Sequence, residues 1–259
     1  MIKTRQEKIR RLLAEQGRLN VRELAGRLRV TEMTIRRDLS GLEADGVLTR
    51  THGGCVLHSP FVAELSFPLK RRMRQAQKTA IAREAVNLLK RCQSIYLDTG
   101  TTALQVARAL SPNLELTVYT NNLCVATELM GRRGLRVVVY GGVLTGKSPD
   151  LAGEIAMAQV QKFRLDVAIV GGDALDVKRG EFYSADIETA LMSRVAQRQV
   201  DRVLMAMDSS KIGKRGLAVV GKLGPGMTLI TDDEVGQAER TAIRATGAKL
   251  ICAKVHAET

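Results

Sequence analysis

Residues 31–57 read TEMTIRRDLSGLEADGVLTRTHGGCVL, and this stretch decides the fold of the N-terminal part of the chain. It starts with Thr31, a good helix N-cap, and apolar residues then recur at helical spacing over residues 32–44. The apolar positions are Ile35, Leu39 and Leu42. The polar positions off this stripe are Thr34, Arg36, Arg37 and Ser40. Such a helix can bury one face in a core while it presents polar side chains to the major groove of DNA.

Two more helices are predicted upstream of this one. The first covers residues 4–16, where Ile9, Leu12 and Leu13 form an apolar stripe that ends at Gly17. The second covers residues 21–28 after Asn20, another good N-cap, and only residues 29–30 separate it from the third helix. Helices joined by so tight a turn are typical of a helix-turn-helix. The alternative is a three-helix bundle with a charged outer face.

A β-hairpin is predicted directly after the third helix. Residues 47–51 form a short β-like run, His52-Gly53-Gly54 is a turn, and residues 55–57 return as a second strand. A hairpin in this place is the wing of a winged helix-turn-helix. Arg50 and His52 on the wing are expected to lie near phosphate or the minor groove.

The order of these residues resembles the DNA-binding head of the DeoR family. The resemblance rests on Thr34-Ile35-Arg36-Arg37-Asp38-Leu39, Leu42-Glu43, Gly46-Val47-Leu48 and His52-Gly53-Gly54, with Arg5-Gln6 and Val21-Leu24-Ala25 further upstream. It implies that Thr34, Arg36 and Arg37 contact DNA. Asp38 cannot easily approach phosphate, so we expect it to orient a neighbouring arginine or to cap local structure. The full predicted set of contacts to a double-stranded DNA operator is Thr31, Thr34, Arg36, Arg37, Arg50 and His52.

The distribution of charge agrees with an anionic polymer as partner. Residues 1–78 hold 17 Lys and Arg against 8 Asp and Glu, whereas residues 79–259 hold 23 against 19, and the whole chain carries +13. A concentrated basic segment favours nucleic acid, because neutralised phosphates release condensed counterions. A solvated, arginine-rich surface is the other interpretation.

These patterns predict a winged helix-turn-helix DNA-binding domain over residues 1–57 and a linker over 58–78. For the remaining domain, over 79–259, the resemblance to the DeoR family implies effector sensing and oligomerisation. The linker contains Pro60 and Pro68, which argue against one continuous helix. It is expected to become helical near residues 69–77. We interpret its basic run, Lys70-Arg71-Arg72-Met73-Arg74, as a solvated face rather than a contact to the DNA backbone.

Strand and helix patterns alternate from residue 79 onward, which predicts an α/β domain with a mostly parallel sheet. The predicted helices cover residues 81–89, 102–110, 123–130 and 187–197. The predicted strands cover residues 94–97, 116–119, 136–140, 166–170, 203–207, 227–230 and 250–252.

Small and polar residues follow several of these strands, where ligands collect in such sheets. The segments are Asp98-Thr99-Gly100-Thr101-Thr102, Thr120-Asn121-Asn122, Gly141-Gly142, Gly171-Gly172-Asp173 and Asp208-Ser209-Ser210-Lys211. The first opens a helix, whose free N–H groups suit a phosphate or another anion. Each segment alone is an ordinary turn, but their repetition predicts one shared site. The predicted effector-binding residues are Asp98, Thr99, Gly100, Thr101, Thr102, Asn121, Gly141, Gly142, Asp173 and Lys211. GxGxxG does not occur, which disfavours a dinucleotide.

The same segments resemble the sensor domain of the DeoR family, which is similar in fold to ribose-phosphate isomerases. The resemblance implies a phosphorylated sugar or related metabolite as effector, a homo-oligomer (a dimer or a tetramer), and repression of a carbohydrate-use operon. It also raises the alternative of an isomerase-like enzyme with an appended DNA-binding head. Those isomerases carry an Asp-Gly-Ala-Asp-Glu run, whereas this chain reads Val170-Gly171-Gly172-Asp173-Ala174. With two of three acids lost, we expect no catalytic residues, no metal and no cofactor, although Asp186 and Glu188 remain as spare acids.

The chain is expected to be cytoplasmic. None of its four cysteines forms a CxxC pair, and each lies in or beside an apolar run, which favours reduced and mostly buried thiols. The first residues are charged throughout, unlike a signal peptide, and no apolar stretch approaches the roughly 18 residues of a membrane span.

Overall fold

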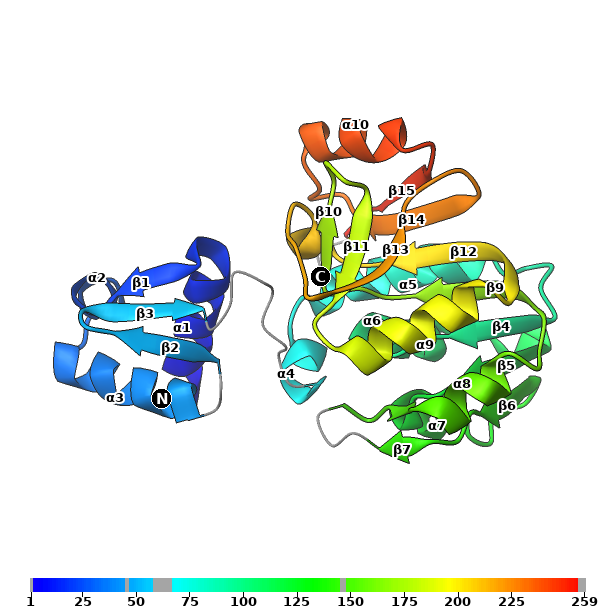
Figure 1. Cartoon of the computed structure of the whole chain (residues 1–259), viewed down its shortest axis with the longest axis horizontal. Helices are drawn as coiled ribbons and strands as arrows, with labels where there is room; N and C mark the ends of the chain where they lie inside the picture. Colours follow the sequence, from blue (N-terminus) through cyan, green and yellow to red (C-terminus); the bar gives the residue numbers. More distant parts are fainter. Residues whose placement is uncertain (1, 45–46, 58–66, 145–147, 256–259) are drawn as a thin grey trace. The chain divides into compact units, whose positions relative to one another are not determined.

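The computed structural model describes residues 2–44, 47–57, 67–144 and 148–255. The chain divides into two compact units, Met1–Leu65 (unit 1) and Ser66–Thr259 (unit 2), each with its own core (Figure 1). Residues 58–66 of the predicted linker, including Pro60, and Gly46 of the predicted wing lie outside the described residues. Among the described residues, no helix is both long and apolar enough to span a membrane.

Unit 1 is a winged helix-turn-helix, as predicted. Its elements are α1 (Ile2–Gln16), β1 (Arg18–Asn20), α2 (Val21–Leu28), α3 (Glu32–Ala44), β2 (Leu48–Thr51) and β3 (Gly54–Leu57). The three strands form one antiparallel sheet in the order β1-β3-β2. We had not predicted β1, because a three-residue strand is too short to show an alternating pattern. Its one buried side chain, Leu19, lies opposite Cys55.

The core of unit 1 explains why these helices form. Ile9 and Leu13 of α1, Leu24 of α2, and Ile35, Leu39 and Leu42 of α3 are fully buried together. The predicted helix ends are also present. The Asn20 side chain accepts a hydrogen bond from Arg22 N at 2.8 Å, and Gly17 ends α1 with a φ of 71°. Glycine adopts this left-handed conformation without a Cβ penalty.

Unit 2 is built on a seven-stranded sheet in which every neighbouring pair is parallel. The strands are β4 (Ser94–Leu97), β5 (Leu116–Thr120), β6 (Leu135–Val139), β9 (Leu165–Val170), β12 (Val200–Ala206), β14 (Met227–Asp232) and β15 (Lys249–Ala253). Their order is β15-β14-β12-β9-β4-β5-β6. The first three strands, β4, β5 and β6, follow one another toward one edge of the sheet. The chain then returns to the other side of β4, where β9, β12, β14 and β15 follow one another toward the opposite edge. The order reverses between β4 and β9, and such a switch point is where ligands bind in open α/β sheets.

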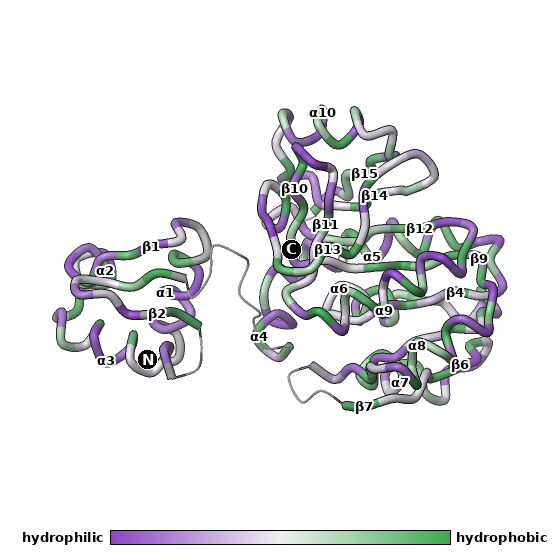
Figure 2. The backbone as a smooth tube through the Cα atoms, viewed as in Figure 1, coloured by the Kyte–Doolittle hydropathy of each residue, from purple (hydrophilic) through white to green (hydrophobic). Residues whose placement is uncertain are grey.

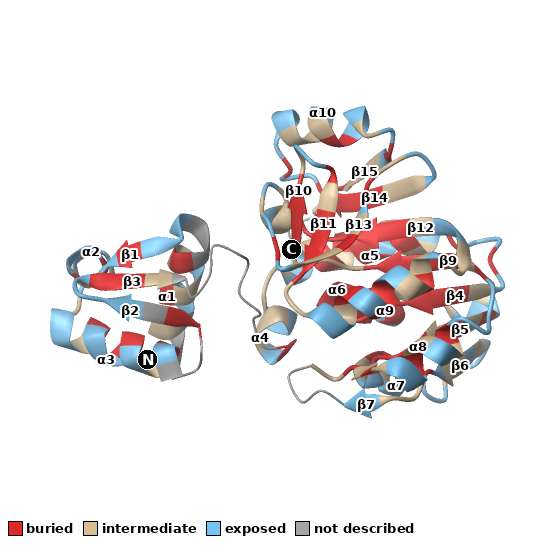
Figure 3. Cartoon of the chain, in the orientation of Figure 1, coloured by how far each residue is buried: buried red, intermediate tan, exposed pale blue. Residues whose placement is uncertain are grey.

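Helices cover both faces of this sheet. On one face are α4 (Phe67–Arg72), α5 (Gln75–Asn87), α6 (Thr101–Ala109) and α7 (Leu123–Leu129). On the other are α8 (Glu154–Val160), α9 (Ile187–Gln197) and α10 (Gln237–Ala245). Two short 3-10 helices, η1 (Pro112–Leu114) and η2 (Ser209–Lys211), complete the connections. The helices alternate between hydrophobic and hydrophilic residues (Figure 2), and the buried residues concentrate in the strands and on the inner helix faces (Figure 3).

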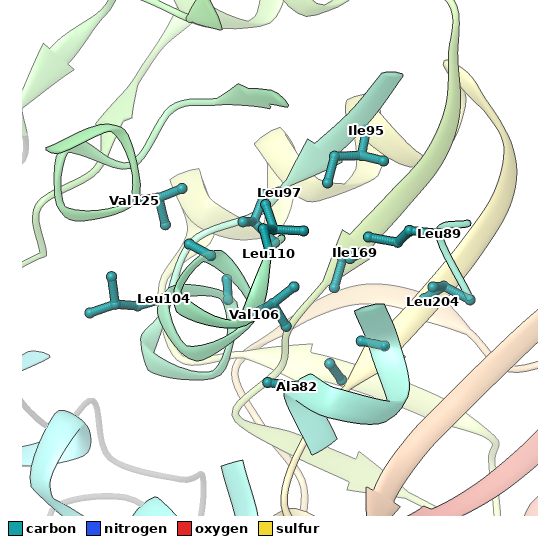
Figure 4. Close-up of a cluster of buried hydrophobic side chains, with 14 of the residues drawn as sticks. Ala82, Leu89, Ile95, Leu97, Leu104, Val106, Leu110, Val125, Ile169 and Leu204 are labelled. Carbon is teal, nitrogen blue, oxygen red and sulfur yellow. The ribbon is translucent and has the colours of Figure 1, made fainter. Parts of the chain in front are cut away.

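The first face shows how the core is assembled. Leu104 and Val106 of α6 and Val125 of α7 pack with Leu97 of β4 and Ile169 of β9, all nearly free of solvent exposure (Figure 4). Burying each such side chain contributes roughly 1.5–3 kcal/mol. This packing fixes the ends of β4 and β9, and with them the start of α6.

Several short elements were not predicted. They are α8, α10, a ribbon of β7 (Val143–Leu144) with β8 (Leu151–Ala152), and a sheet of β10 (Ala174–Asp176), β11 (Glu181–Ser184) and β13 (Ala218–Lys222). The β11–β13 pairing shifts register between Phe182 and Tyr183, which breaks the period-2 pattern. Of the cysteines, Cys55 and Cys92 are buried, as expected, whereas Cys124 and Cys252 are half-buried, and all four are free thiols.

Candidate functional site

Helix α3 turns a polar face outward from unit 1. Thr31, Arg36, Arg37 and Ser40 are exposed and Thr34 is half-buried, on the side away from the buried stripe. Thr31 caps the helix, since its hydroxyl accepts from Thr34 N at 3.3 Å. The two threonine hydroxyls also share a hydrogen bond of 2.9 Å. Arg36 lies 3.8 Å from Glu32, one turn earlier. The predicted DNA contacts of α3 therefore share one accessible face.

Asp38 is turned away from this face and is buried. Its carboxylate accepts two hydrogen bonds from the guanidinium of Arg5 on α1, one of them 3.1 Å long. The same hydrogen bonding raises the pKa of Arg5. The expectation that Asp38 orients a neighbouring arginine is confirmed, and this contact joins α1 to α3.

The wing is attached to α3 through Arg50 on β2. Arg50 N donates to Glu43 Oε1 at 2.9 Å, and its guanidinium donates to Ser40 Oγ at 2.8 Å. His52 is exposed in the turn between β2 and β3. Arg50 thus extends the polar face of α3, while His52 lies at the tip of the wing.

Asp98 and Gly171 meet at the switch point of unit 2. Asp98 follows β4 and Gly171 follows β9, and Gly171 N donates to Asp98 Oδ2 at 3.4 Å. The hydroxyl of Ser193 on α9 donates to the same oxygen, and Tyr96 Oη donates to Oδ1 at 3.1 Å. Burial raises the pKa of Asp98, although these hydrogen bonds oppose the rise. Both carboxylate oxygens are occupied by protein donors, so Asp98 holds the two strand ends together.

The start of α6 lies beside this contact. Gly100 occupies the N-cap position with a φ of 96°, and no side chain caps the helix. Thr99, Thr101 and Thr102 are buried around it. The first N–H groups of a helix have no partner within the helix, and together with the helix dipole they favour an anion. The loop therefore presents backbone donors where the sequence predicts a phosphate.

The other predicted strand ends connect to this loop through side chains. Tyr96 shares its one hydroxyl hydrogen between Asp98 Oδ1 and Asn121 Oδ1, which lies 2.8 Å from Tyr96 Oη, and Asn121 Nδ2 donates to Leu151 O on β8 at 2.8 Å. Gly142 lies against β8 so closely that a Cβ there would be 2.5 Å from Ala152 O, whereas Gly141 N donates to Gln159 Oε1. Gly142 is therefore required for the close approach of two backbones, whereas a Cβ on Gly141 would meet the Gln159 side chain only at an ordinary contact distance of 3.5 Å. Gly142 connects to Asp98 through β8, Asn121 and Tyr96.

Asp173 lies between two lysines at the same edge. Lys70 Nζ is 2.8 Å and Lys211 Nζ 3.8 Å from Asp173 Oδ1, and Ala185 N donates to the other oxygen at 3.0 Å. Lys211 also donates to Gly172 O at 2.8 Å. Burial works against ionisation of Asp173, but the two lysines outweigh it and hold its pKa well below the usual range. The predicted residues Asp173 and Lys211 are thus brought together, next to Gly171 and the Asp98 loop.

The interpretation of the basic run as a solvated face holds for Arg71 and Arg72 and is wrong for Lys70 and Arg74. Only part of the run, Arg71 and Arg72, is exposed, whereas Lys70 and Arg74 point inward onto acids. Arg74 NH2 donates to Ser209 at 3.0 Å, Asp232 at 3.2 Å and Glu234 at 2.8 Å, and Arg74 Nε lies 3.5 Å from Asp208. The run is also not one helix, because Arg74 takes a φ of 53° between α4 and α5. Acids at the strand ends attract the run, which the sequence pattern of one segment cannot show.

Lys78 completes this arrangement and was missed. It is buried, and its ammonium donates to the carbonyl oxygens of Lys70 and Met73. Burial lowers its pKa to about 8. The recurrence of Lys70, Arg74 and Lys78 at every fourth residue was a sequence signal for a shared role, although the break at Arg74 means that they do not lie on one helix. Tyr96, Ser193 and Asp232 carried no such signal, because each acts as a partner of a residue distant in sequence.

Asp150, before β8, gives a pH-dependent prediction. Burial raises its pKa to about 6, although hydrogen bonds from Ser148 and Asn122 oppose the rise. A carboxyl whose pKa is raised on folding stabilises the fold below its unfolded pKa of roughly 4, and this contribution is lost as the pH rises through 6. Asp150→Asn should therefore match the parent in stability at pH 3, below both pKa values, and exceed it by about 2–3 kcal/mol at pH 8. Chemical denaturation at both pH values checks this, and a difference that does not change with pH would refute it.

The fold and site together define a class: a winged helix-turn-helix unit joined to a parallel α/β unit with a polar switch point. Family models agree along most of the chain. The model of the DeoR-like helix-turn-helix domain matches residues 5–61, and that of the DeoR C terminal sensor domain matches residues 73–233. The chain belongs to the DeoR family of transcriptional regulators, so the resemblance stated above is confirmed.

Curated relatives match over nearly their whole length. YulB, an HTH-type transcriptional regulator of Bacillus subtilis, is 34% identical over 94% of this chain and 93% of its own. GolR, an HTH-type transcriptional regulator of Listeria innocua, is 32% identical over 90% of this chain and 92% of its own. The glycerol-3-phosphate regulon repressor of Escherichia coli is 29% identical over 85% of this chain and 87% of its own. Among solved structures, ribose 5-phosphate isomerase A of Methanocaldococcus jannaschii is 20% identical over 52% of this chain and 53% of its own, with a TM-score of 0.38, a likeness that carries no argument here.

Proposed function

We propose that this protein is a sequence-specific repressor of a carbohydrate-use operon, and that a phosphorylated sugar bound to unit 2 modulates its affinity for DNA. The observation that carries the proposal is the switch point. There an uncapped helix start, the Asp98–Gly171 contact and the lysines around Asp173 lie at the carboxyl edge of a parallel sheet. A phosphate needs backbone N–H donors and cationic partners, and this edge offers both.

On the effector side, the residues take different roles. Gly100, Thr101 and Thr102 are proposed to bind the phosphate through the start of α6, and Lys211 to neutralise it. Asp98 is proposed to position the loop rather than contact the ligand, because its two oxygens already accept from protein donors. Thr99, Asn121, Gly141 and Gly142 shape the same edge, and Asp173 holds Lys211 in place.

The isomerase-like enzyme is not the function proposed. General base catalysis requires a group whose pKa lies near the working pH. The pKa of Asp173 is held far below that by Lys70 and Lys211. Of the spare acids, Asp186 caps α9 by accepting from Thr189 N at 2.8 Å, and Glu188 is exposed. For these three acids the placements support binding rather than proton transfer.

The proposed regulator acts in the cytoplasm as a homo-oligomer, either a dimer or a tetramer. Several subunits would place several recognition helices on one operator, as dimeric helix-turn-helix proteins do on paired half-sites. The effector changes operator affinity by favouring one arrangement of the subunits. Linkage then requires the operator to change effector affinity by the same factor.

The effector part is tested with the full chain and pairs of sugars that differ only in a phosphate group. Isothermal titration should detect binding of at least one phosphorylated sugar. The protein should bind the unphosphorylated parent of that sugar at least tenfold more weakly, and the Lys211→Gln variant should bind the phosphorylated sugar at least tenfold more weakly than the parent protein does. Lys222→Gln, on β13, serves as the charge-matched control. Equal affinity for both members of every pair, or no binding of any, would contradict the proposal.

If α3 contacts DNA as proposed, Arg36→Ala and Arg37→Ala should each weaken binding to a DNA duplex selected from a random pool. A base contact should cost roughly 1–3 kcal/mol and relax the preference at one position, whereas a phosphate contact should weaken all sequences alike. Electrophoretic mobility shifts on selected and scrambled duplexes separate these cases. Arg133→Ala, an exposed arginine of unit 2, should leave binding unchanged. Unchanged binding in both α3 variants would mean that another surface reads DNA.

A further inference from the structure

Helix α3 carries one exposed apolar side chain on its polar face, Met33, with 77% of its surface exposed. We propose that Met33 is a specificity-determining residue that packs against the C5 methyl group of a thymine in the major groove. The inference rests on the proposed function, in that α3 must enter the groove. It adds an apolar contact to a face for which only polar contacts had been predicted.

The position of Met33 on the helix supports this role. Thr31 caps α3, so Met33 lies in the first turn, and Arg36 and Arg37 follow three and four residues later on the same face. The buried residue Ile35 points the other way, into the core. In helix-turn-helix proteins the N-terminal residues of the recognition helix contact the base edges. Met33 is therefore placed where contacts to bases are made.

The neighbours of Met33 in this first turn are already engaged. The hydroxyls of Thr31 and Thr34 hydrogen-bond to each other at 2.9 Å. Glu32 carries a negative charge that phosphate repels, and it lies 3.8 Å from Arg36. The threonine hydroxyls keep capacity for a polar contact, whereas Met33 is the exposed side chain of the turn that offers an apolar surface to a base edge.

The chemistry of the groove then identifies its partner. Thymine carries a C5 methyl group in the major groove, which proteins recognise through apolar contact. Methionine is unbranched and polarizable, so it adapts to an irregular surface. Among the described residues of unit 1, Met33 is the one large hydrophobic side chain that is exposed. Single exposed hydrophobic residues are common on protein surfaces. The experiment must therefore distinguish a Met33 that contacts thymine from one that is exposed without a role.

The test removes a single methyl group from the DNA. Duplexes are selected from a random pool with the full-length protein, and each preferred thymine is replaced in turn by deoxyuridine. We expect the parent to lose about fourfold affinity at one thymine of each half-site, the factor for burying one methyl group. Met33→Ala should bind the thymine and deoxyuridine duplexes equally. Met33→Leu, which stays apolar, should keep part of the discrimination.

Two results would overturn the inference: a parent that tolerates every deoxyuridine within the error of the measurement, or a Met33→Ala protein that discriminates as well as the parent. Because Met33 is outside the core, Met33→Ala should fold normally, and its circular dichroism and melting temperature confirm this independently. Failure to select any duplex would contradict the proposed function and this inference with it. Normal selection without thymine discrimination would contradict the inference alone.

Discussion

Replacement of Arg74 by alanine is expected to lower the free energy of unfolding of unit 2 by about 3–5 kcal/mol, the cost of removing one partner from a buried ion pair. Arg74 is the cation shared by Asp208, Asp232 and Glu234. Asp232 is fully buried and Asp208 nearly so. Without the guanidinium, two buried carboxylates at neighbouring strand ends would face each other without this compensation.

The matched control for Arg74→Ala is Arg71→Ala, an exposed arginine of the same run, which should change stability by less than about 0.5 kcal/mol. Arg74→Gly separates charge from backbone. Glycine adopts the left-handed conformation at φ 53° without strain, which should stabilise this variant by roughly 1 kcal/mol relative to Arg74→Ala. The Arg74→Gly protein should nevertheless remain much less stable than the parent, because it also lacks the guanidinium. Urea denaturation followed by circular dichroism, with hydrogen exchange to assign the transition to unit 2, measures all three. Equal losses in Arg71→Ala and Arg74→Ala would contradict the role given to Arg74.

The second large effect is expected at the wing, where Gly54→Ala should destabilise unit 1 by about 3 kcal/mol or more. Overpacking of a well-packed site typically costs 1–3 kcal/mol, and here the obstacle is backbone rather than a flexible side chain. A Cβ on Gly54 would lie 2.0 Å from Leu19 O and 3.0 Å from Leu19 C. The β1–β3 pairing must separate to make room, and the wing is then no longer held.

The neighbouring glycine is the control for this prediction. A Cβ on Gly53 meets nothing within 4 Å, so Gly53→Ala should leave unit 1 intact. Hydrogen exchange of the β1 and β3 amides should accelerate in Gly54→Ala alone, and binding to the selected duplex should fall at least tenfold. The stability of unit 2 should be unchanged. Identical behaviour of the two variants would show that β1 and β3 do not approach as closely as described.

Local patterns predicted the elements that are long and have one clear apolar face. The stripe of Ile35, Leu39 and Leu42 predicted α3, because a helix in a small unit must bury such a face. The alternation of short apolar runs with helices predicted the parallel sheet. The small sheet of β10, β11 and β13 was not predictable in this way, because its strands are three to five residues long and one pairing shifts register.

The same distinction holds for the candidate site. Residues that follow strands are found from the sequence, because the carboxyl ends of parallel strands meet at one edge. Their roles are not found in this way. Asp98 was expected to bind the effector, and only the structure shows that Tyr96, Ser193 and Gly171 already occupy its oxygens. Lys70 and Arg74 were interpreted as solvated, since the acids that attract them are more than 100 residues away in the chain.

We propose that unit 1 reads DNA and that a phosphorylated sugar bound to unit 2 controls this reading. One measurement tests it most directly: the affinity of the full-length protein for its selected duplex, with and without each sugar phosphate, and the affinity for the sugar phosphate with and without the duplex. We predict that at least one sugar phosphate changes duplex affinity tenfold or more, and that the duplex changes affinity for that compound by the same factor. Duplex affinity that no sugar phosphate alters would contradict the account.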